Sequence, residues 1–454
     1  MSVPGAPASM TRQPPSPQEL RLIPTGGPLD LPAHLDRYGP FYLRAADRLI
    51  SEVEQSGLTG RGGGAFPAGR KLRTVAQAAR RGGRTSAVVV ANGSESEPAS
   101  SKDTVLLRSA PHLILDGIAL AAAAVGASSA YLCLGERAQP GERFLLQAIA
   151  ERERAGLNHV PVELAATAAG YLSGQETALI ATLNGGPPLP TLVPPLPAER
   201  GAHRRPTLVM NVETLAHVAL IGRYGAGWFR ELGSAGSPGT ALVTISGAVN
   251  RPGVYEIPLG VRLGELLQRA GLPERPQAAL TGGYFGAWLP LPDALGVGVS
   301  EERLRPAGAA LGPGVLAVLP ESRCGLAETA RIVGFLASQI AGQCGPCVNG
   351  MPALAEAMNW IAFGQPEADL VGWAQQLTRL VSGRGACHLP DGAAALVASA
   401  ISVFDADLRA HVAAGPCARA GAAPLLPIPR PSHPSDPRQP EGRPTRRQLS
   451  RRPG

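Results

Sequence analysis

The sequence predicts three folded units in succession: an α/β domain with a parallel sheet, a β-rich module and an all-α end domain. Up to about residue 238, strand-like and helix-like segments alternate at the spacing of parallel strands with right-handed crossovers. From Thr240 the pattern changes to a hairpin, and from Leu326 to His411 it is helical. A chain of 454 residues also exceeds the usual size of a single core, so roughly two to four domains are expected.

The α/β domain is expected over residues 41–238, after an irregular, proline-rich arm at residues 1–40. The apolar pattern predicts helices over 41–55, 111–126 and 142–155, a helix ending near Arg80, and strands over 85–91, 130–134 and 160–164. Cys133 lies in one of these strands and is expected to be a core residue. Asn211 is expected to cap the helix that follows it.

The β-rich module is expected over residues 239–322 and the helical domain over residues 323–412. Strands at 241–247 and 253–257 flank an Asn-Arg-Pro-Gly turn, a short helix follows at 263–270, and residues 315–319 form a closing strand. Residues 413–454 are rich in proline and arginine and are expected to be a disordered basic tail.

The charge distribution argues against nucleic acid as a partner. The tail holds eight arginines against Asp436 and Glu441, so it accounts for +6 of the net charge of +7 and the folded part is nearly neutral. An inert solvated tail is the simpler account, and contact with lipid headgroups or an acidic partner is the alternative.

Targeting and cysteine patterns favour a cytoplasmic setting. Six cysteines are too few for a disulfide scaffold of this length. We find no apolar run of about 18 residues that would predict a membrane span, and no secretory signal pattern at the N-terminus.

A glycine-rich loop before the first strand has the composition of an anion cradle. The glycines within residues 60–64 let backbone N–H groups approach a ligand, Pro67 suits the start of a helix, and Arg61 and Lys71 would neutralise a phosphate. Lys71 and Lys102 are the only lysines of the chain, and both fall in candidate ligand loops. The alternative is a flexible linker or a tight turn.

Two further loops are candidates for ligand contacts. Residues 92–98 follow the first strand directly, where open α/β sheets usually bind ligands. A second Gly-and-acid turn at residues 169–180 starts a helix at about Glu176, and Glu213 lies at the start of another. The simpler account of these two glutamates is charge complementarity with the helix N-termini.

Three late cysteines suggest a metal or iron–sulfur site. Cys344 and Cys347 form a Cys-x-x-Cys pair before a helix, and Cys387 lies 40 positions after Cys347. Buried unliganded thiols, a zinc site with His388 as fourth ligand, and a dithiol redox pair are the alternatives.

These motifs occur together in one known family. From about Leu49 to His411 the chain resembles the NADH-binding flavoprotein subunit of respiratory complex I, known in bacteria as the F subunit, and its relatives in NAD-linked hydrogenases and formate dehydrogenases. The resemblance implies a Rossmann-like FMN domain, a ubiquitin-like, soluble-ligand-binding β-grasp module and an all-α bundle holding a [4Fe–4S] cluster. It also implies that FMN takes a hydride from NADH and that single electrons then pass to the cluster and a partner redox subunit.

The resemblance also implies a role for individual residues. Gly60, Arg61, Gly62, Gly63 and Lys71 would hold the FMN phosphate and ribityl chain. Asn92 and Glu95 would contact the flavin and Glu97 would face the nicotinamide, which makes Glu95 and Glu97 the expected catalytic residues. Phe66 would stack on NADH, and the cofactor site would be completed by Ser94, Gly174, Gln175, Glu176, Asn211 and Thr214. Cys344, Cys347 and Cys387 match three of the four cluster ligands.

The departures from the family pattern fall mainly on the dinucleotide side. Ser94 stands where the family has aspartate, Gln175 where it has glutamate, Val193 where it has lysine and Leu196 where it has an aromatic residue. These changes should weaken NADH binding more than FMN binding. Ala341 replaces the first cluster cysteine, so we expect a three-cysteine cluster of altered stability, with a three-iron cluster or none as alternatives. Cys324 lies 17 positions before Ala341, at the expected far end of a helix.

Two function classes follow. The first is a flavoprotein electron-transfer subunit of the NADH dehydrogenase type, working with ferredoxin-like or complex I-like subunits that could bring it to a membrane surface. The second is a non-catalytic paralogue that docks in a redox complex and binds FMN without oxidising NADH. A zinc-binding regulator is a more distant third.

Overall fold

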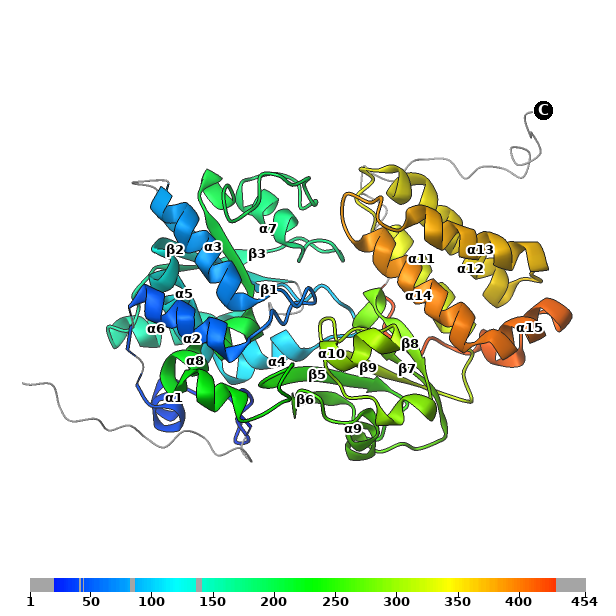
Figure 1. Cartoon of the computed structure of the whole chain (residues 1–454), viewed down its shortest axis with the longest axis horizontal. Helices are drawn as coiled ribbons and strands as arrows, with labels where there is room; N and C mark the ends of the chain where they lie inside the picture. Colours follow the sequence, from blue (N-terminus) through cyan, green and yellow to red (C-terminus); the bar gives the residue numbers. More distant parts are fainter. Residues whose placement is uncertain (1–19, 41, 44, 82–85, 136–140, 430–454) are drawn as a thin grey trace, which may run out of the picture.

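The computed structural model describes residues 20–429, apart from residues 41, 44, 82–85 and 136–140. Three units follow one another along the chain, and Figure 1 shows the α/β unit on one side, the β-rich unit below and the helical unit on the other side. The order and type of the three units agree with the sequence-based prediction.

The first unit is built on a four-stranded sheet in which every neighbouring pair is parallel. The strand order is β3-β2-β1-β4. Residues 88–91 of β1 are fully buried, as expected for a central strand covered on both faces by helices. The strands are β1 (Ala87–Gly93), β2 (Ala127–Leu134), β3 (Val162–Ala166) and β4 (Thr207–Asn211).

Helices cover this sheet, and two of them form the centre of its core. Helix α5 is mostly apolar and almost entirely buried, and it lies against α8 so closely that a Cβ at Gly117 would sit 2.0 Å from the carbonyl oxygen of Leu215. Cys133 is buried, as predicted. The helices are α2 (Ala46–Ser56), α3 (Ala68–Arg81), α4 (Lys102–Ser109), α5 (Pro111–Val125), α6 (Glu142–Arg154), α7 (Glu176–Leu183) and α8 (Val212–Arg230).

The structure corrects the prediction for the two ends of the chain and for one helix. The arm was expected to be irregular, but it contains helix α1 (Leu31–Tyr38), which Asp30 caps by accepting a hydrogen bond from Ala33 N–H. Helix α4 was not predicted. The expected tail begins too early, because residues 413–429 are ordered against the helical unit and Leu426 is buried there. Residues 430–454 lie outside the described residues.

The second unit is a five-stranded mixed sheet of order β6-β5-β9-β7-β8. The predicted hairpin is confirmed as the antiparallel pair β5–β6, and the closing strand β9 lies between β5, to which it is parallel, and β7. Helix α9 (Leu263–Ala270) packs its leucines on one face of the sheet. The strands are β5 (Thr240–Gly247), β6 (Gly253–Pro258), β7 (Pro276–Thr281), β8 (Ala287–Pro290) and β9 (Val315–Pro320).

The third unit is helical, and it shares a hydrophobic core with the other face of the mixed sheet. Trp288 of β8 reaches into this core, where its indole N–H donates to Thr329 Oγ1 at 2.9 Å. The two units therefore form one packed body. The helices are α11 (Gly325–Ser338), α12 (Met351–Phe363), α13 (Ala368–Val381), α14 (Leu389–Val403) and α15 (Asp405–Ala414).

Among the described residues, no single helix has the length and apolar character needed to cross a membrane. Two bent helix pairs, α4 with α5 and α14 with α15, meet the criteria of length and composition together.

Candidate flavin and iron–sulfur sites

The parallel sheet places its ligand-binding crevice between β1 and β4. From β1 the chain crosses to β2 and β3 on one side, whereas β4 pairs with β1 on the other side. The order therefore reverses between β1 and β4, and in open α/β sheets ligands bind outside the carboxyl ends of the strands at this switch point. Asn92 and Asn211 are paired at the ends of the two strands.

The glycine loop lies directly over this switch point. The backbone N–H of Arg61 donates to Thr214 Oγ1 at 2.9 Å, and a Cβ at Gly62 would lie 3.3 Å from Asn211 Cβ. Gly63 has φ +111°, a conformation that favours glycine. Within the described part of the chain, the N–H groups of Gly62, Gly63 and Gly64 donate to no acceptor. The loop therefore offers free N–H groups at the place where a phosphate would bind.

The Arg61 side chain does not join this cradle, which corrects its predicted role as a charge partner of the phosphate. Its guanidinium donates to Thr59 Oγ1 at 3.0 Å and to the Thr240 carbonyl oxygen at 3.1 Å, and it lies 3.9 Å from Glu213. Burial lowers the pKa of Arg61, and Glu213 opposes this shift. Arg61 instead fixes the shape of the loop through its backbone N–H, which donates to Thr214 Oγ1.

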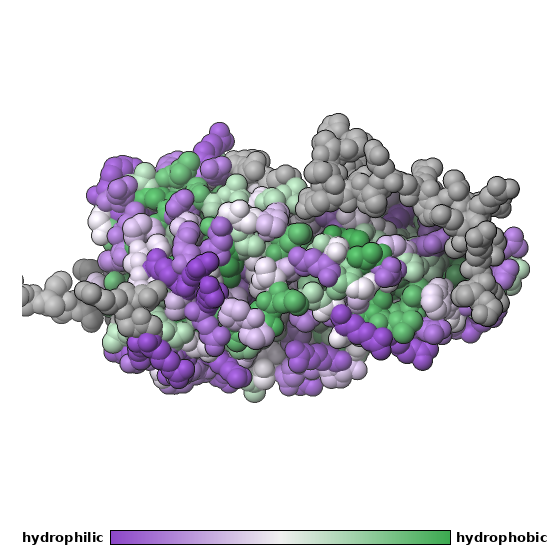
Figure 2. Space-filling view, turned by 90° about the horizontal axis from the view of Figure 1, so that it is seen from above, coloured by the Kyte–Doolittle hydropathy of each residue, from purple (hydrophilic) through white to green (hydrophobic). Residues whose placement is uncertain are grey.

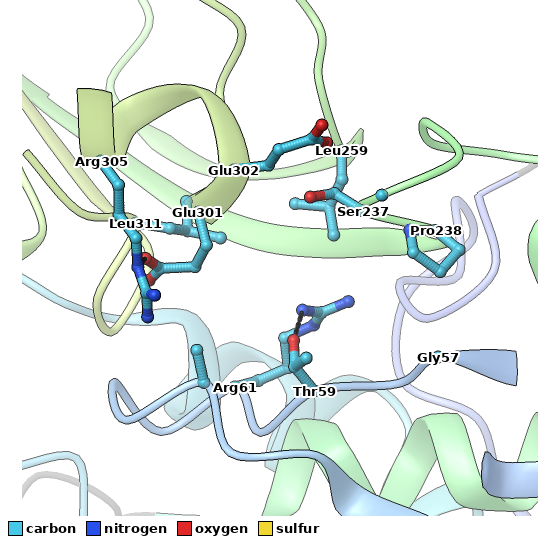
Figure 3. A pocket seen from close by; sticks show the side chains of 12 residues that line it. Gly57, Thr59, Arg61, Ser237, Pro238, Leu259, Glu301, Glu302, Arg305 and Leu311 are labelled. Carbon is cyan, nitrogen blue, oxygen red and sulfur yellow. Dashed lines mark hydrogen bonds and ion pairs between the residues drawn. The ribbon is translucent and has the colours of Figure 1, made fainter. Parts of the chain in front are cut away.

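The Arg61 side chain instead lines a cavity between the α/β unit and the mixed-sheet unit. Figure 3 shows Arg61 and Thr59 on one side of this cavity, with Glu301 and Arg305 of the mixed-sheet unit across from them. Arg61 therefore ties the glycine loop to the neighbouring unit.

Lys71 and Phe66 flank the glycine loop on its helix side. Lys71 lies in α3, and its ammonium is 2.8 Å from Glu176 Oε2 at the start of α7. Phe66 is 49% exposed, and the Arg70 guanidinium lies over its ring at 5.8 Å from the centroid. The side chain of Gln175 accepts from the N–H groups of Thr177 and Ala178, so this residue caps α7.

The turn before α7 is held against the end of β1. The Asn92 amide donates to the Gly174 carbonyl oxygen at 2.8 Å. The turn packs closely here, because a Cβ at Gly174 would lie 2.9 Å from Ser96 Oγ and 3.5 Å from Ser94 Cβ, so the Ser96 side chain would have to move. The Ser94 hydroxyl is buried here and has no hydrogen-bond partner among the described residues, so it is a polar group that a ligand would satisfy.

Glu95 lies beside this pocket, but its carboxylate serves helix α4. Its oxygens accept hydrogen bonds from the Ser100 hydroxyl at 2.7 Å, from the N–H groups of Asp103 and Thr104 at 2.9 Å each, and from the Thr104 hydroxyl at 2.6 Å. The carboxylate therefore caps the N-terminus of α4. This arrangement favours a positioning role for Glu95 over the catalytic role predicted from the sequence.

Glu97 lies where the three units meet. Its Oε2 accepts from the Tyr171 hydroxyl at 2.8 Å and from the Tyr284 N–H at 2.9 Å, and Oε1 accepts from the Ala99 N–H at 3.1 Å. Burial and the neighbouring Glu97 raise the pKa of Tyr171 well above its ordinary value. Glu97 thus links the loop after β1 to the turn before α7 and to the mixed-sheet unit.

A buried ion cluster lies beneath the switch point and includes the second lysine. Lys102 was placed in a ligand loop by the sequence, but the residue is 1% exposed and its ammonium lies 2.7 Å from Asp103 and 2.9 Å from Glu213. Asp103 in turn accepts from the Asn211 amide at 2.7 Å. Burial lowers the pKa of Lys102, but the two carboxylates outweigh it and raise the pKa. Lys102 therefore supports the strand ends from below.

The structure brings the three predicted cluster cysteines together in the helical unit. Cys347 lies close enough to Cys344 and Cys387 for both thiols to affect its pKa, and the neighbouring Cys347 lowers the pKa of Cys387 to about 7. The N–H of Ala341 points at the Cys347 sulfur. Cysteine thiolates are the usual ligands of iron–sulfur clusters, so these three thiols are candidate ligands.

The zinc alternative with His388 is not supported. The His388 side chain is 93% exposed and its ring contacts Asp391, on the outside of the unit. In the described ranges, the group of three donor atoms close enough to hold a single ion is Cys324, His411 and Cys417, away from Cys344. Sequence inspection missed this second group because its members are 87 and 6 residues apart and share no local motif.

The flavin side and the cysteine side are in direct contact. The Tyr171 N–H, in the turn before α7, donates to Gln339 Oε1 at 3.0 Å. Gln339 ends α11 and lies two residues before Ala341. The Tyr171 ring also packs against Phe285 and Phe335. The two candidate cofactor sites are therefore held in a fixed relation.

Comparisons with known proteins agree with this arrangement. The chain matches three family models: the Nuo51 FMN-binding domain over residues 53–220, the SLBB domain over residues 242–282, and the NADH-ubiquinone oxidoreductase-F iron–sulfur binding region over residues 327–411. The first match covers the glycine loop and the strand ends, and the third covers all three cluster cysteines.

Similar whole chains come from several bacteria. The chain is 34% identical over 380 residues to the F 2 subunit of NADH-quinone oxidoreductase of Rhizobium meliloti, covering 81% of this chain and 89% of that one. It is 35% identical over 382 residues to the F subunit of the same type of enzyme of Mycobacterium tuberculosis, covering 82% and 86%.

Solved structures give the same result. The chain is similar to a chain of NAD⁺-reducing [NiFe]-hydrogenase in the H₂-reduced state, with a TM-score of 0.72 and 32% identity over 82% of this chain. It spans 63% of the length of that hydrogenase chain. Sequence, strand order and gathered cysteines lead to one conclusion: the chain belongs to the family of NADH-quinone oxidoreductase F subunits.

Proposed function

We propose that this chain is the FMN-carrying electron-input subunit of a redox complex, oxidising NADH and delivering electrons one at a time to an iron–sulfur centre. The observation that carries the proposal is the glycine loop, whose free N–H groups lie over the β1–β4 switch point. Bound FMN would supply a two-electron acceptor that can release electrons singly.

The residues that would bind FMN divide by the part they contact. The N–H groups of Gly62, Gly63 and Gly64, with the ammonium of Lys71, would hold the phosphate. The buried Ser94 hydroxyl and the Asn92 amide would lie beside the flavin, where the Gly174 turn closes the pocket. Gly60, Arg61, Asn211 and Thr214 would shape the loop, and Glu95 would fix the strand end by capping α4.

The dinucleotide side is proposed around Phe66, Glu97, Gln175 and Glu176. Phe66 is half exposed, and Glu97 lies at the junction of the units. Val193 and Leu196 are each 49% exposed, and they place apolar surface where the family has a cation and an aromatic ring. Figure 2 shows apolar patches among polar residues on the upper face of the molecule. The loss of the cation at residue 193 and of the aromatic ring at residue 196 favours weak use of NADH.

The second candidate function follows from the same surface: a docking subunit that holds FMN but does not oxidise NADH. The two functions are separated by adding NADH to the FMN-loaded protein under anaerobic conditions. We expect the visible flavin absorbance to bleach, at a rate that rises with NADH concentration. Flavin that stays oxidised in excess NADH, while dithionite still reduces it, would establish the docking role instead.

In the helical unit, Cys344, Cys347 and Cys387 would hold the iron–sulfur cluster, with the fourth cluster position not served by a thiol because residue 341 is alanine. Partner redox subunits of the ferredoxin-like or complex I-like type would then receive the electrons. Anaerobically purified protein that contains neither iron nor acid-labile sulfide would contradict this part of the proposal.

Restoring the missing thiol should stabilise the cluster. Because the Ala341 N–H already points at the Cys347 sulfur, Ala341→Cys places a thiol beside the three that are present. We expect iron and sulfide content to rise, and the cluster to survive exposure to air longer than in the parent protein. Iron, sulfide and the EPR signal of the reduced protein are the measurements.

The matched control for this change is Ser338→Cys, which also adds a thiol near the end of α11. The Ser338 hydroxyl donates to the Phe335 carbonyl oxygen at 2.7 Å, so this side chain folds back on its own helix. It should leave cluster content unchanged. Equal behaviour of the two variants would show that residue 341 is not at the open position.

We propose limits for the three domains and a location for the protein. The FMN domain corresponds to residues 41–238 with a Rossmann-like sheet, the module at 239–322 to a β-grasp fold, and the iron–sulfur domain begins at 323 and extends past 412 to include the ordered segment up to 429. A cytoplasmic location, with any membrane association made through a partner complex, fits this function.

A further inference from the structure

A second group of metal-binding side chains lies in the helical unit, at the opposite end of α11 from Ala341. Cys324 immediately precedes α11, His411 lies in the last turn of α15, and Cys417 precedes the short helix η7 (Ala418–Gly421). Their donor atoms lie within 4.8 Å of one another, and Cys324 Sγ is 3.8 Å from His411 Nε2. Three distant parts of the chain thus bring two thiols and an imidazole to one point.

The imidazole of His411 is oriented as a metal ligand. Its Nδ1 lies 2.9 Å from the carbonyl oxygen of Ile361, which can only accept a hydrogen bond, so Nδ1 carries the proton. Nε2 accepts the backbone N–H of Cys417 at 3.1 Å, which agrees with the same tautomer. Nε2 is therefore the unprotonated nitrogen, and it lies 3.8 Å from Cys324 Sγ. A metal ion would replace the Cys417 N–H as the partner of its lone pair, and the Ile361 carbonyl fixes the ring as second-sphere partners of metal-bound histidines do.

The spacing and charge of the group suit zinc. Zinc–sulfur bonds of about 2.3 Å and zinc–nitrogen bonds of about 2.0 Å in a tetrahedron place ligand atoms about 3.5 to 3.8 Å apart. The distance between Cys324 Sγ and His411 Nε2 is 3.8 Å before any metal binds. Two thiolates would neutralise a divalent ion. Arg419, which hydrogen-bonds Cys417, is itself paired with Asp407 at 2.6 Å, so no net charge is left at the site.

We propose that Cys324, His411 and Cys417 bind a zinc ion, separate from the cluster held by Cys344, Cys347 and Cys387. Binding releases the two thiol protons, and water takes the fourth coordination position on the side of Cys417, which is only partly buried. Cys324 and His411 are buried, so the ion is enclosed on the other sides.

The zinc ion fastens the segment after α15 to the start of α11. This segment already contacts α11 through hydrogen bonds of two side chains: Arg331 donates to the Ala420 carbonyl oxygen at 3.0 Å and to that of Ala422, and Glu328 accepts the Leu425 N–H at 3.1 Å. Both side chains belong to the same helix. A metal shared by α11, α15 and η7 would hold all three together.

The test is the metal content of the full-length protein and of two serine variants. Each is purified under reducing conditions, incubated with zinc sulfate, desalted and analysed for zinc and iron. We expect the parent protein to retain one zinc per chain. Cys417→Ser should lose it. Competition with a chromophoric chelator should show that the zinc affinity of this variant falls by more than the roughly 10- to 100-fold that loss of a supporting hydrogen bond costs. Its iron content should match that of the parent.

Cys344→Ser is the matched control, because it removes a thiol from the other site. It should lower iron and keep zinc. Cys417 is partly exposed and serine has nearly its size, so the variant should fold, which the unchanged iron content verifies. X-ray absorption spectroscopy of the parent protein at the zinc edge should show two sulfur ligands and a nitrogen ligand. Zinc lost in Cys344→Ser but kept in Cys417→Ser, or a zinc-free parent with Cys324 disulfide-linked to Cys417, would overturn the proposal.

Hydrogen exchange gives a second measurement that does not depend on metal analysis. Zinc should slow exchange of the amides in residues 415–421 of the parent protein and leave those of Cys417→Ser unchanged. Equal exchange in the parent with and without zinc would contradict the fastening role.

Discussion

Replacing Lys102 with methionine is expected to lower the free energy of unfolding of the α/β unit by about 3 to 5 kcal/mol, because a buried ion cluster loses its cation. Asp103 and Glu213 would remain buried, 5% and 0% exposed, without the ammonium that lies within 2.9 Å of both. Hydrogen exchange of β1 and β4 measures this loss at the strand ends, since unfolding of a protein with several units is not a single two-state transition.

The control is Arg80→Met, which removes one member of an exposed pair with Asp47. Solvent screens exposed pairs, so they contribute little to stability and exchange should change little. Adding Asp103→Asn to Lys102→Met should recover part of the loss, since a neutral amide costs less to bury than an unpaired carboxylate. If Lys102→Met and Arg80→Met behave alike, the ion cluster does not support the strand ends.

Replacing Lys71 with alanine is expected to weaken FMN binding by roughly 10- to 100-fold, the loss of one charged hydrogen bond of about 1.5 to 3 kcal/mol. The Lys71 ammonium is partly exposed beside the glycine loop, where its partner in the structure is Glu176. The dissociation constant of FMN, measured by quenching of flavin fluorescence, gives the result. The fold should stay intact, because Lys71 lies on the surface side of α3.

Arg73→Ala is the matched control for this variant, two residues further along the same helix. Its guanidinium pairs with Glu54 and is 42% exposed, so it should not contact the phosphate. FMN affinity should then equal that of the parent protein. Unchanged affinity in Lys71→Ala would mean that the phosphate is bound elsewhere than at the glycine loop.

Local patterns were sufficient to predict most of the fold. The hairpin around the Asn-Arg-Pro-Gly turn, helix α9 and the burial of Cys133 depend on nearest neighbours in the chain, and all three are as predicted. Helix α4 was missed because its N-terminus is capped by the side chain of Glu95, several residues upstream. Short-range capping signals do not report such a contact.

The candidate site was also predicted only in part, because some of its contacts depend on tertiary packing. The sequence placed the glycine loop, Asn92 and Asn211 together, and the structure brings them together at the switch point. It could not show that the Arg61 guanidinium turns toward Thr240, or that Lys102 is buried between two carboxylates, because these directions are set by packing between units. The group around His411 also depends on tertiary contacts.

The most direct measurement of the central claim is a titration of FMN-free protein with FMN, followed by flavin fluorescence. If the free N–H groups over the β1–β4 switch point bind the FMN phosphate, fluorescence should be quenched until one FMN per chain is bound, and Lys71→Ala should require a higher concentration to reach the same point. Fluorescence that rises in proportion to added FMN, as in buffer alone, at every concentration tested would contradict the claim.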